Sequence, residues 1–274
     1  MITSNRNTVF NNRTYGLIIL CIIILISAAF YDMQISQSVV NPDSGWAMVI
    51  EDYGELPGLI TLLTAIFIYH KKKKHSSNAR TILYSVVLTY SAFMLFNYSG
   101  FLLLKPFITS LYPVLTFAAI LTIISVVLAK ELKVNFSDTA FSFAKTVLLM
   151  GLFGYMFFVQ PLKVFWGRVR FRDLDALYSN FTPWYLPNGI TGSESFPSGH
   201  SAMGFLLISF FILFRNNSLI SKYIKYIFIL FWAITVAAGR VVTGAHFLSD
   251  VVVGSAGMIF CYLYFSNQDR VRNV

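Results

Sequence analysis

Long apolar blocks recur along this chain and constrain its fold more than any other feature. We predict eight membrane-spanning helices, at residues 15–31, 57–70, 81–104, 109–129, 139–162, 201–214, 226–240 and 247–266. A segment surrounded by lipid hydrocarbon must satisfy its backbone hydrogen bonds internally, so each block is expected to be helical. The sequence therefore predicts an all-α, polytopic transmembrane helix bundle.

The composition agrees with a membrane protein and argues against other classes. Hydrophobic residues make up 56% of the 274 residues, while charged residues make up only 12%; a soluble domain has about 25% charged residues. The net charge of +9 could suggest a nucleic-acid partner, but the basic residues gather at the ends of apolar blocks. We therefore predict no nucleic-acid binding. Cys21 and Cys261 lie inside predicted spans and define no disulfide framework.

The basic residues also predict the orientation of the chain. Clusters such as 71–74, Lys222 and Lys225 fall on the same side as the N-terminus, and the positive-inside rule makes that side cytoplasmic. With an even number of spans, both termini are cytoplasmic. We predict a multi-pass cell-membrane protein whose loops after the first, third, fifth and seventh spans face outward.

The first external loop, residues 32–57, contains acidic residues and aromatic residues suited to a membrane interface, among them Asp43, Glu51, Asp52, Glu55, Trp46 and Tyr53. We interpret it as a solvated acidic loop with interfacial aromatic residues. A short interfacial helix within the loop is the alternative.

The first of three polar clusters follows the fifth span. Lys163 and Arg170 are seven residues apart and share one face if the helix continues, which would make a cationic clamp for phosphate oxygens. On that helix Arg168 and Arg172 would point elsewhere, toward lipid headgroups. Taken alone, this cluster fits interfacial snorkelling equally well.

The second polar cluster is Phe196-Pro197-Ser198-Gly199-His200, where an external loop enters an apolar helix. Proline suits the first turn of a helix, and Ser198 with the Gly199 amide can direct hydrogen-bond donors at an anion. His200 beside that anion could donate a proton to a leaving oxygen. A capped helix start with an incidental histidine is the alternative.

The third polar cluster is Arg240, His246 and Asp250, at the border of the seventh and eighth spans. His246 and Asp250 share one helical face, so we predict that Asp250 accepts a hydrogen bond from one imidazole nitrogen and leaves the other as a nucleophile. Arg240 would hold phosphate oxygens. A structural arginine–aspartate pair is the alternative. All three clusters are predicted on the external face and would form one site.

Together the clusters resemble the three-part signature of the type 2 phosphatidic acid phosphatase superfamily, also called lipid phosphate phosphatases: Lys163-x6-Arg170, Pro197-Ser198-Gly199-His200 and Arg240-x5-His246-x3-Asp250. The resemblance covers residues 160–255. Two flanking positions depart from it, since Phe171 stands where the family usually has proline and Gly239 where it usually has serine.

The resemblance implies a metal-independent phosphatase without a cofactor, which hydrolyses a lipid phosphate or diphosphate through a phosphohistidine. His246 would attack phosphorus while Asp250 orients it, and His200 would protonate the leaving oxygen and then activate water. The implied phosphate-binding residues are Lys163, Arg170, Ser198, Gly199 and Arg240. The family's six-helix core would occupy residues 81–274, after a two-span N-terminal addition at 1–80.

Two other functions remain open from the sequence. A vanadate-dependent haloperoxidase shares the phosphate-shaped anion pocket, although known members of that class are soluble. A lipid scramblase, transporter or headgroup-binding protein would use the cations for recognition without hydrolysis. The predicted partners are a membrane lipid phosphate as substrate and the bilayer, and a soluble phosphate ester is the alternative substrate. The sequence specifies neither the lipid nor an oligomeric state.

Overall fold

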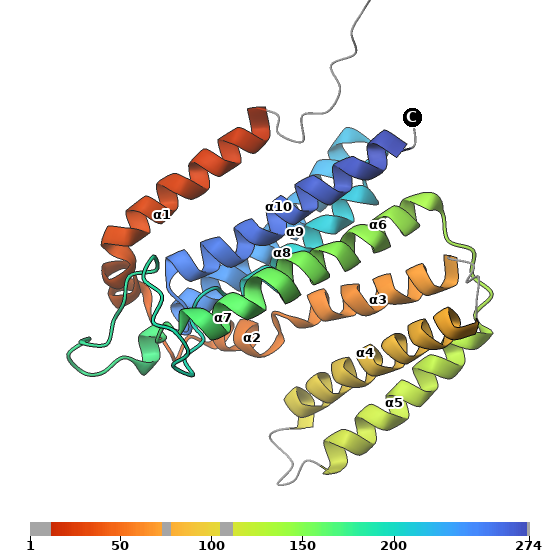
Figure 1. Cartoon of the computed structure of the whole chain (residues 1–274), viewed down its shortest axis with the longest axis horizontal. Helices are drawn as coiled ribbons and strands as arrows, with labels where there is room; N and C mark the ends of the chain where they lie inside the picture. The colour runs from red at the N-terminus through yellow and green to blue at the C-terminus, as the bar shows by residue number, and fades with distance from the viewer. Residues whose placement is uncertain (1–11, 73–77, 105–111, 273–274) are drawn as a thin grey trace, which may run out of the picture.

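The fold is an elongated bundle of helices, seen in a computed structural model that describes residues 12–72, 78–104 and 112–272 (Figure 1). Most of the described residues are helical, and none of them lies in a strand. The predicted all-α bundle is confirmed.

The α-helices of the described residues are α1 (Asn12–Val39), α2 (Gly45–Tyr53), α3 (Leu56–Lys72), α4 (Asn78–Leu104), α5 (Tyr112–Glu131), α6 (Asp138–Leu149), α7 (Gln160–Trp166), α8 (Gly199–Leu206), α9 (Leu219–Val242) and α10 (Leu248–Arg272). A π-helical segment, η1 (Met150–Val159), joins α6 to α7 without interruption. Two 3-10 segments are η2 (Phe171–Asp173) and η3 (Leu207–Ile212), the second of which continues α8.

Each predicted span overlaps a helix or a run of helices. Within the part of the chain that the structure describes, four stretches are long and apolar enough to cross a membrane: Thr14–Val39, Asp138–Asp173, Leu219–Val242 and Leu248–Asn267. The outward face of α9 is apolar as well, with Phe228 and Phe231 exposed, as expected of a helix that lipid surrounds. The chain is therefore a membrane protein, and the number of crossings remains a prediction.

The helices of the signature form the centre of the bundle. α8 packs against α9, α10 and η1, while α3 lies along α6 and α1 lies against α10. α4 and α5 pair with each other, and α4 packs on α3 at the edge of the bundle (Figure 1). The division of the chain at residue 80 is still a prediction; in the structure α1, α2 and α3, which precede it, all contact helices of the signature.

The hydrophobic core lies between α6, α8 and α10. Phe143, Met150, Met203, Leu206 and Met258 are almost completely buried there. Close van der Waals packing of such side chains stabilises the association of helices inside a membrane. The core holds the helices so that the end of α7, the start of α8, the end of α9 and the start of α10 lie at one end of the bundle, next to α2 (Figure 1).

Candidate active site

The helix that carries Lys163 ends at Trp166, because Gly167 adopts the left-handed conformation with φ of 59°. A Cβ atom at Gly167 would lie 2.1 Å from the carbonyl oxygen of Gly189, so the turn requires glycine. The helix does not continue from Lys163 to Arg170, so the condition under which these two residues would share one helical face is not met. The chain turns instead, and the two cations remain close enough for the charge of Arg170 to act on Lys163.

Lys163 lies beside the second polar cluster. Its Nζ donates to the carbonyl oxygen of Glu194 at 2.8 Å, and the side chain is mostly buried. Its Cε lies 3.3 Å from where a Cβ at Gly199 would stand. A glycine at 199 thus leaves room for this cation next to the first turn of α8.

The second cluster is fixed to α10 through its backbone. Ser198 caps α8, since its Oγ accepts a hydrogen bond from the amide of Ser201 at 3.3 Å. The Ser198 amide donates to the carbonyl oxygen of Asp250 at 2.9 Å. A Cβ at Gly254 would lie 2.3 Å from the Ser198 carbonyl oxygen, so a glycine on α10 permits this close approach. The second and third clusters therefore form one unit.

His246 is buried and held in one tautomer. Its Nδ1 lies 2.6 Å from the carbonyl oxygen of Ser195. A carbonyl oxygen can only accept, so Nδ1 carries the proton and Nε2 carries the free lone pair. Burial lowers the pKa of His246 to about 3, which keeps the imidazole neutral at physiological pH.

Asp250 does not make the predicted hydrogen bond to His246. Its Oδ2 lies 3.7 Å from His246 Nδ1, and this oxygen instead accepts from Ser195 Oγ at 2.5 Å and from the Phe247 amide at 2.9 Å. Asp250 therefore holds Ser195, and Ser195 orients His246 through its carbonyl group. The prediction is wrong in the partner, since the orienting contact comes from a residue 51 positions earlier in the chain.

Sequence reasoning missed the role of Arg168, which is completely buried rather than directed at headgroups. Its Nη1 donates to Asp250 Oδ1 at 2.6 Å and to Ser249 Oγ at 2.8 Å, and its Nη2 donates to Asp32 Oδ2 at 3.0 Å. Its guanidinium carbon lies 4.1 Å from the centre of the Phe247 ring. One feature of the sequence indicated this role: Asp32 lies at the edge of an apolar block, and a carboxylate in that position requires a cationic partner.

Arg240 reaches the same end from α9 and is buried. Its Nη1 lies 3.0 Å from Glu51 Oε1, an oxygen that also accepts from Arg172 Nη1 at 2.9 Å. The ion pair is poorly aligned, so within the described residues Nε and Nη1 of Arg240 lack a hydrogen-bond partner. Buried donors are normally satisfied, and this guanidinium therefore retains donors for the oxygens of an anion.

Both ring nitrogens of His200 face oxygen atoms. Nδ1 lies 2.9 Å from Glu55 Oε1, and Nε2 lies 3.1 Å from the carbonyl oxygen of Glu51. The ring can donate to both only when both nitrogens carry protons. Burial alone would raise the pKa of Glu55, but His200, Arg240 and Lys163 outweigh it and hold that pKa below its ordinary value.

The interpretation of residues 32–57 as a solvated acidic loop is wrong for Glu51 and Glu55. The loop contains α2, and the side chains of Glu51 and Glu55 are only 25% and 15% exposed. Their four-residue spacing was the one signal in the sequence that both carboxylates could face the same neighbour.

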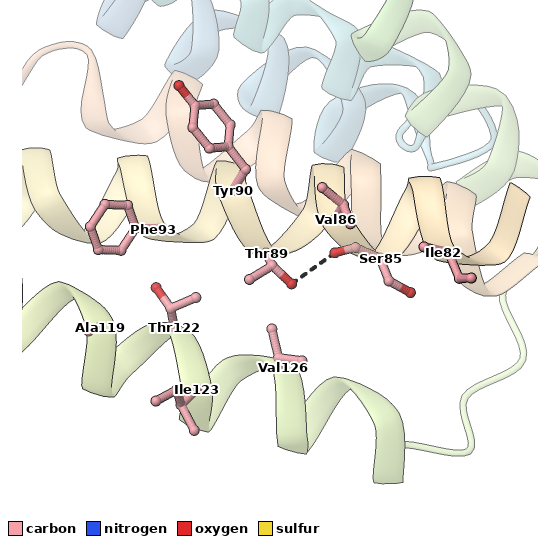
Figure 2. Close-up of a pocket in the computed structure, with 10 residues that line it drawn as sticks. All are labelled: Ile82, Ser85, Val86, Thr89, Tyr90, Phe93, Ala119, Thr122, Ile123 and Val126. Carbon is pink, nitrogen blue, oxygen red and sulfur yellow. Dashed lines mark hydrogen bonds between the residues drawn. The ribbon is translucent and has the colours of Figure 1, made fainter. Parts of the chain in front are cut away.

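One apolar cavity adjoins the site, and a second borders the first. The first, which we call the α3–α4 groove, has a volume of about 410 Å³ and lies between α3 and α4. It is lined by Glu55, Leu59, Leu62, Leu63, Ile66, Tyr90, Met94 and Tyr98. Only Glu55 among these is charged, and it is the residue that contacts His200. The second cavity, of about 690 Å³, lies between α4 and α5 (Figure 2). Tyr90 lines both, and in Figure 2 its ring points away from α5.

Comparison with protein families gives a match for the part of the chain that carries the three clusters. The model described as PAP2 superfamily matches residues 144–273. These residues belong to the PAP2 superfamily. The predicted resemblance is confirmed, and all of the predicted site residues lie within this PAP2 domain. Comparisons with curated proteins and with solved structures give no significant match.

The two departures from the expected PAP2 pattern have structural explanations. A Cβ at Gly239 would lie 2.7 Å from Ile50 Cγ2, so a serine here would collide with α2. The ring of Phe171 packs edge-on against Phe247 at 6.1 Å and stacks on Tyr178 at 5.9 Å. Both positions thus contact parts of the chain that lie against the site.

Proposed function

We propose that this protein is an integral-membrane phosphatase that hydrolyses a lipid phosphate or diphosphate through a phosphohistidine. The observation that carries this proposal is His246, a buried and neutral imidazole whose Nδ1 is fixed on the Ser195 carbonyl, so that Nε2 carries the lone pair. The PAP2 domain supports a phosphatase-type function.

In the first step His246 Nε2 attacks phosphorus, and the bond between phosphorus and the leaving oxygen breaks. The leaving oxygen takes a proton from His200, so the alcohol departs uncharged. Charge on the remaining oxygens is stabilised by cationic side chains and donors at the start of α8, namely Lys163, Arg170, Arg240, Ser198 and the Gly199 amide.

In the second step His200, now neutral, removes a proton from water. The water oxygen bonds to phosphorus while the bond from phosphorus to His246 breaks, which releases phosphate and restores both histidines. Asp250 acts on His246 through Ser195, since Ser195 donates to Asp250 and accepts from His246. This arrangement keeps the nucleophile in one orientation through both steps.

A lipid substrate is supported by the α3–α4 groove. Its apolar lining leads to Glu55, which contacts His200, so a hydrocarbon chain in the groove would leave the phosphate among the cations. The sequence charge pattern supports the orientation that we propose, with both termini cytoplasmic and the site on the external face of the cell membrane.

The proposed function is tested with the purified full-length protein, by measuring phosphate release from a panel of lipid phosphates and a lipid diphosphate in EDTA. We expect release that persists in EDTA and is inhibited by vanadate, which resembles the transition state. Movement of lipid between liposome leaflets without phosphate release would instead indicate transport. Halide oxidation with bound vanadate would indicate a haloperoxidase.

Filling the α3–α4 groove should weaken the binding of long-chain substrates selectively. In Leu63→Trp the indole would occupy part of the space of the hydrocarbon chain, and overfilling a packed site costs about 1–3 kcal/mol. KM for a long-chain lipid phosphate should therefore rise by about 5-fold to 150-fold. The value of kcat/KM for a short, water-soluble phosphate ester should not change.

The matched control for Leu63→Trp is Ile60→Trp, because Ile60 lies on the same helix but is 53% exposed and does not line the groove. We expect this control to leave both substrates unaffected. Equal loss on the long and short substrates in Leu63→Trp would show that the groove does not hold the chain.

A further inference from the structure

A carboxylate that contacts His200 comes from outside the PAP2 domain. Glu55 follows α2 and precedes α3, and its Oε1 lies 2.9 Å from His200 Nδ1. The family match begins only at residue 144. The N-terminal part of this chain therefore contributes a side chain that touches the general acid of the proposed reaction.

We propose, on the basis of the phosphatase function above, that Glu55 is a positioning residue for His200. Its carboxylate fixes the ring through Nδ1 and stabilises the protonated imidazole, as an opposite charge at this distance does. Nε2 then presents its proton to the leaving oxygen, in place of the Glu51 carbonyl oxygen that it faces in the structure.

The charges around Glu55 favour its ionised form. Besides His200 on α8, the titratable groups that act on it or face it come from four other elements: Lys163 on α7, Arg240 on α9, Tyr98 on α4 and Tyr155 on η1. Two of these four are cations, and they oppose the cost of burying a carboxylate. Glu55 is thus suited to remain charged beside His200 over the neutral pH range.

The contact between α9 and α2 also depends on a glycine, Gly239 of α9. A Cβ at Gly239 would lie 2.7 Å from Ile50 Cγ2 and 3.5 Å from the Trp46 ring. The serine that the family usually carries at this position would push α2 away, and α2 leads directly into Glu55. Gly239 therefore lets α2 lie close to α9, and this position of α2 brings Glu55 beside His200.

The test is Glu55→Gln, which keeps a hydrogen-bond acceptor for Nδ1 but removes the charge. With an alkyl lipid phosphate, whose leaving group needs a proton, we expect kcat/KM to fall about 10-fold to 100-fold, less than the roughly 10²–10⁴-fold contribution of a general acid itself. With p-nitrophenyl phosphate, whose leaving group needs no proton, kcat/KM should stay within about 3-fold, because it covers only the steps through attack by His246.

The pH dependence gives a second measurement on the same variant. Without the carboxylate the positive charge of the protonated ring loses the opposite charge that lies 2.9 Å away. The alkaline limb of the pH–rate profile should therefore move to lower pH in Glu55→Gln, while the acid limb stays in place. Asp43→Asn is the matched control, since Asp43 is an exposed carboxylate of the same segment, and it should shift neither limb.

Two further variants distinguish a positioning role of Glu55 from a general loss of structure. In a His200→Ala background Glu55→Gln should have no further effect, because its action passes through the ring. Gly239→Ser should reproduce the selective loss on alkyl phosphates by displacing α2.

An equal loss on alkyl and aryl substrates in Glu55→Gln, or an unchanged alkaline limb, would overturn the role of Glu55 alone. No phosphate release by the unaltered protein would overturn the phosphatase function and this role together.

Discussion

Replacing His246 with asparagine should lower phosphate release by about 10⁴-fold or more, the scale seen when a covalent nucleophile is removed. Asparagine is the informative substitution, because its amide can still donate to the Ser195 carbonyl, as Nδ1 of His246 does. Alanine would leave that buried carbonyl without a partner, which costs about 1–3 kcal/mol of stability on its own. The measurement is initial rate in detergent with a lipid phosphate, alongside thermal unfolding of both proteins.

Trapping of the intermediate gives a second measurement for His246→Asn. A short incubation with radiolabelled substrate, stopped with alkali, should retain label on the unaltered protein as an acid-labile phosphohistidine and none on the variant. His200→Ala should still accept label from an activated aryl phosphate, because attack by His246 does not need the general acid there. Normal phosphate release by a folded His246→Asn protein would rule out the phosphohistidine mechanism.

Replacing Arg168 with methionine should lower the free energy of unfolding by about 3–5 kcal/mol, the cost of removing one partner from a buried ion pair. Methionine preserves much of the side-chain length but leaves Asp32 and Asp250 buried without their shared cation. Activity should fall as well, because Asp250 would no longer be held in place beside Ser195. The measurement is unfolding in mixed micelles, compared with the unaltered protein.

The control for Arg168→Met is Arg172→Met, at a half-exposed arginine (35%) that is paired with Glu51 near the surface. An exposed ion pair contributes about 0–1 kcal/mol, so we expect little change in stability. Adding Asp32→Asn to Arg168→Met should recover part of the loss, because it removes one of the two uncompensated carboxylates. Similar stability of the two single variants would show that the Arg168 network is not structurally important.

The helices and the grouping of the three polar clusters were predictable, because both follow from local patterns. Apolar length indicates each helix, and the positions of Lys163, His200 and His246 relative to the ends of the apolar blocks indicate that they share one end of the bundle. The precise contacts were not predictable. Whether a helix continues past Trp166 depends on Gly167 meeting Gly189, and no periodicity in the sequence encodes that contact.

The contacts that the sequence did not reveal join distant parts of the chain. Asp32 accepts from the Ser249 amide across 217 residues, and Glu51 pairs with Arg240 from a different helix. A single sequence shows that a charged residue in an apolar environment needs a partner, but not which residue supplies it. The same reason explains why Glu51 and Glu55 were assigned to a solvated loop.

The α3–α4 groove has a consequence for how the reaction rate depends on the amount of substrate. For the lipid substrate that we propose, a hydrocarbon chain that reaches Glu55 along this groove would stay in the apolar phase of the bilayer. The quantity that governs turnover is then the mole fraction of substrate among the surrounding lipids, a two-dimensional density. Adding inert lipid at constant substrate per volume would slow the reaction, whereas hydrolysis of a water-soluble ester would follow bulk concentration alone.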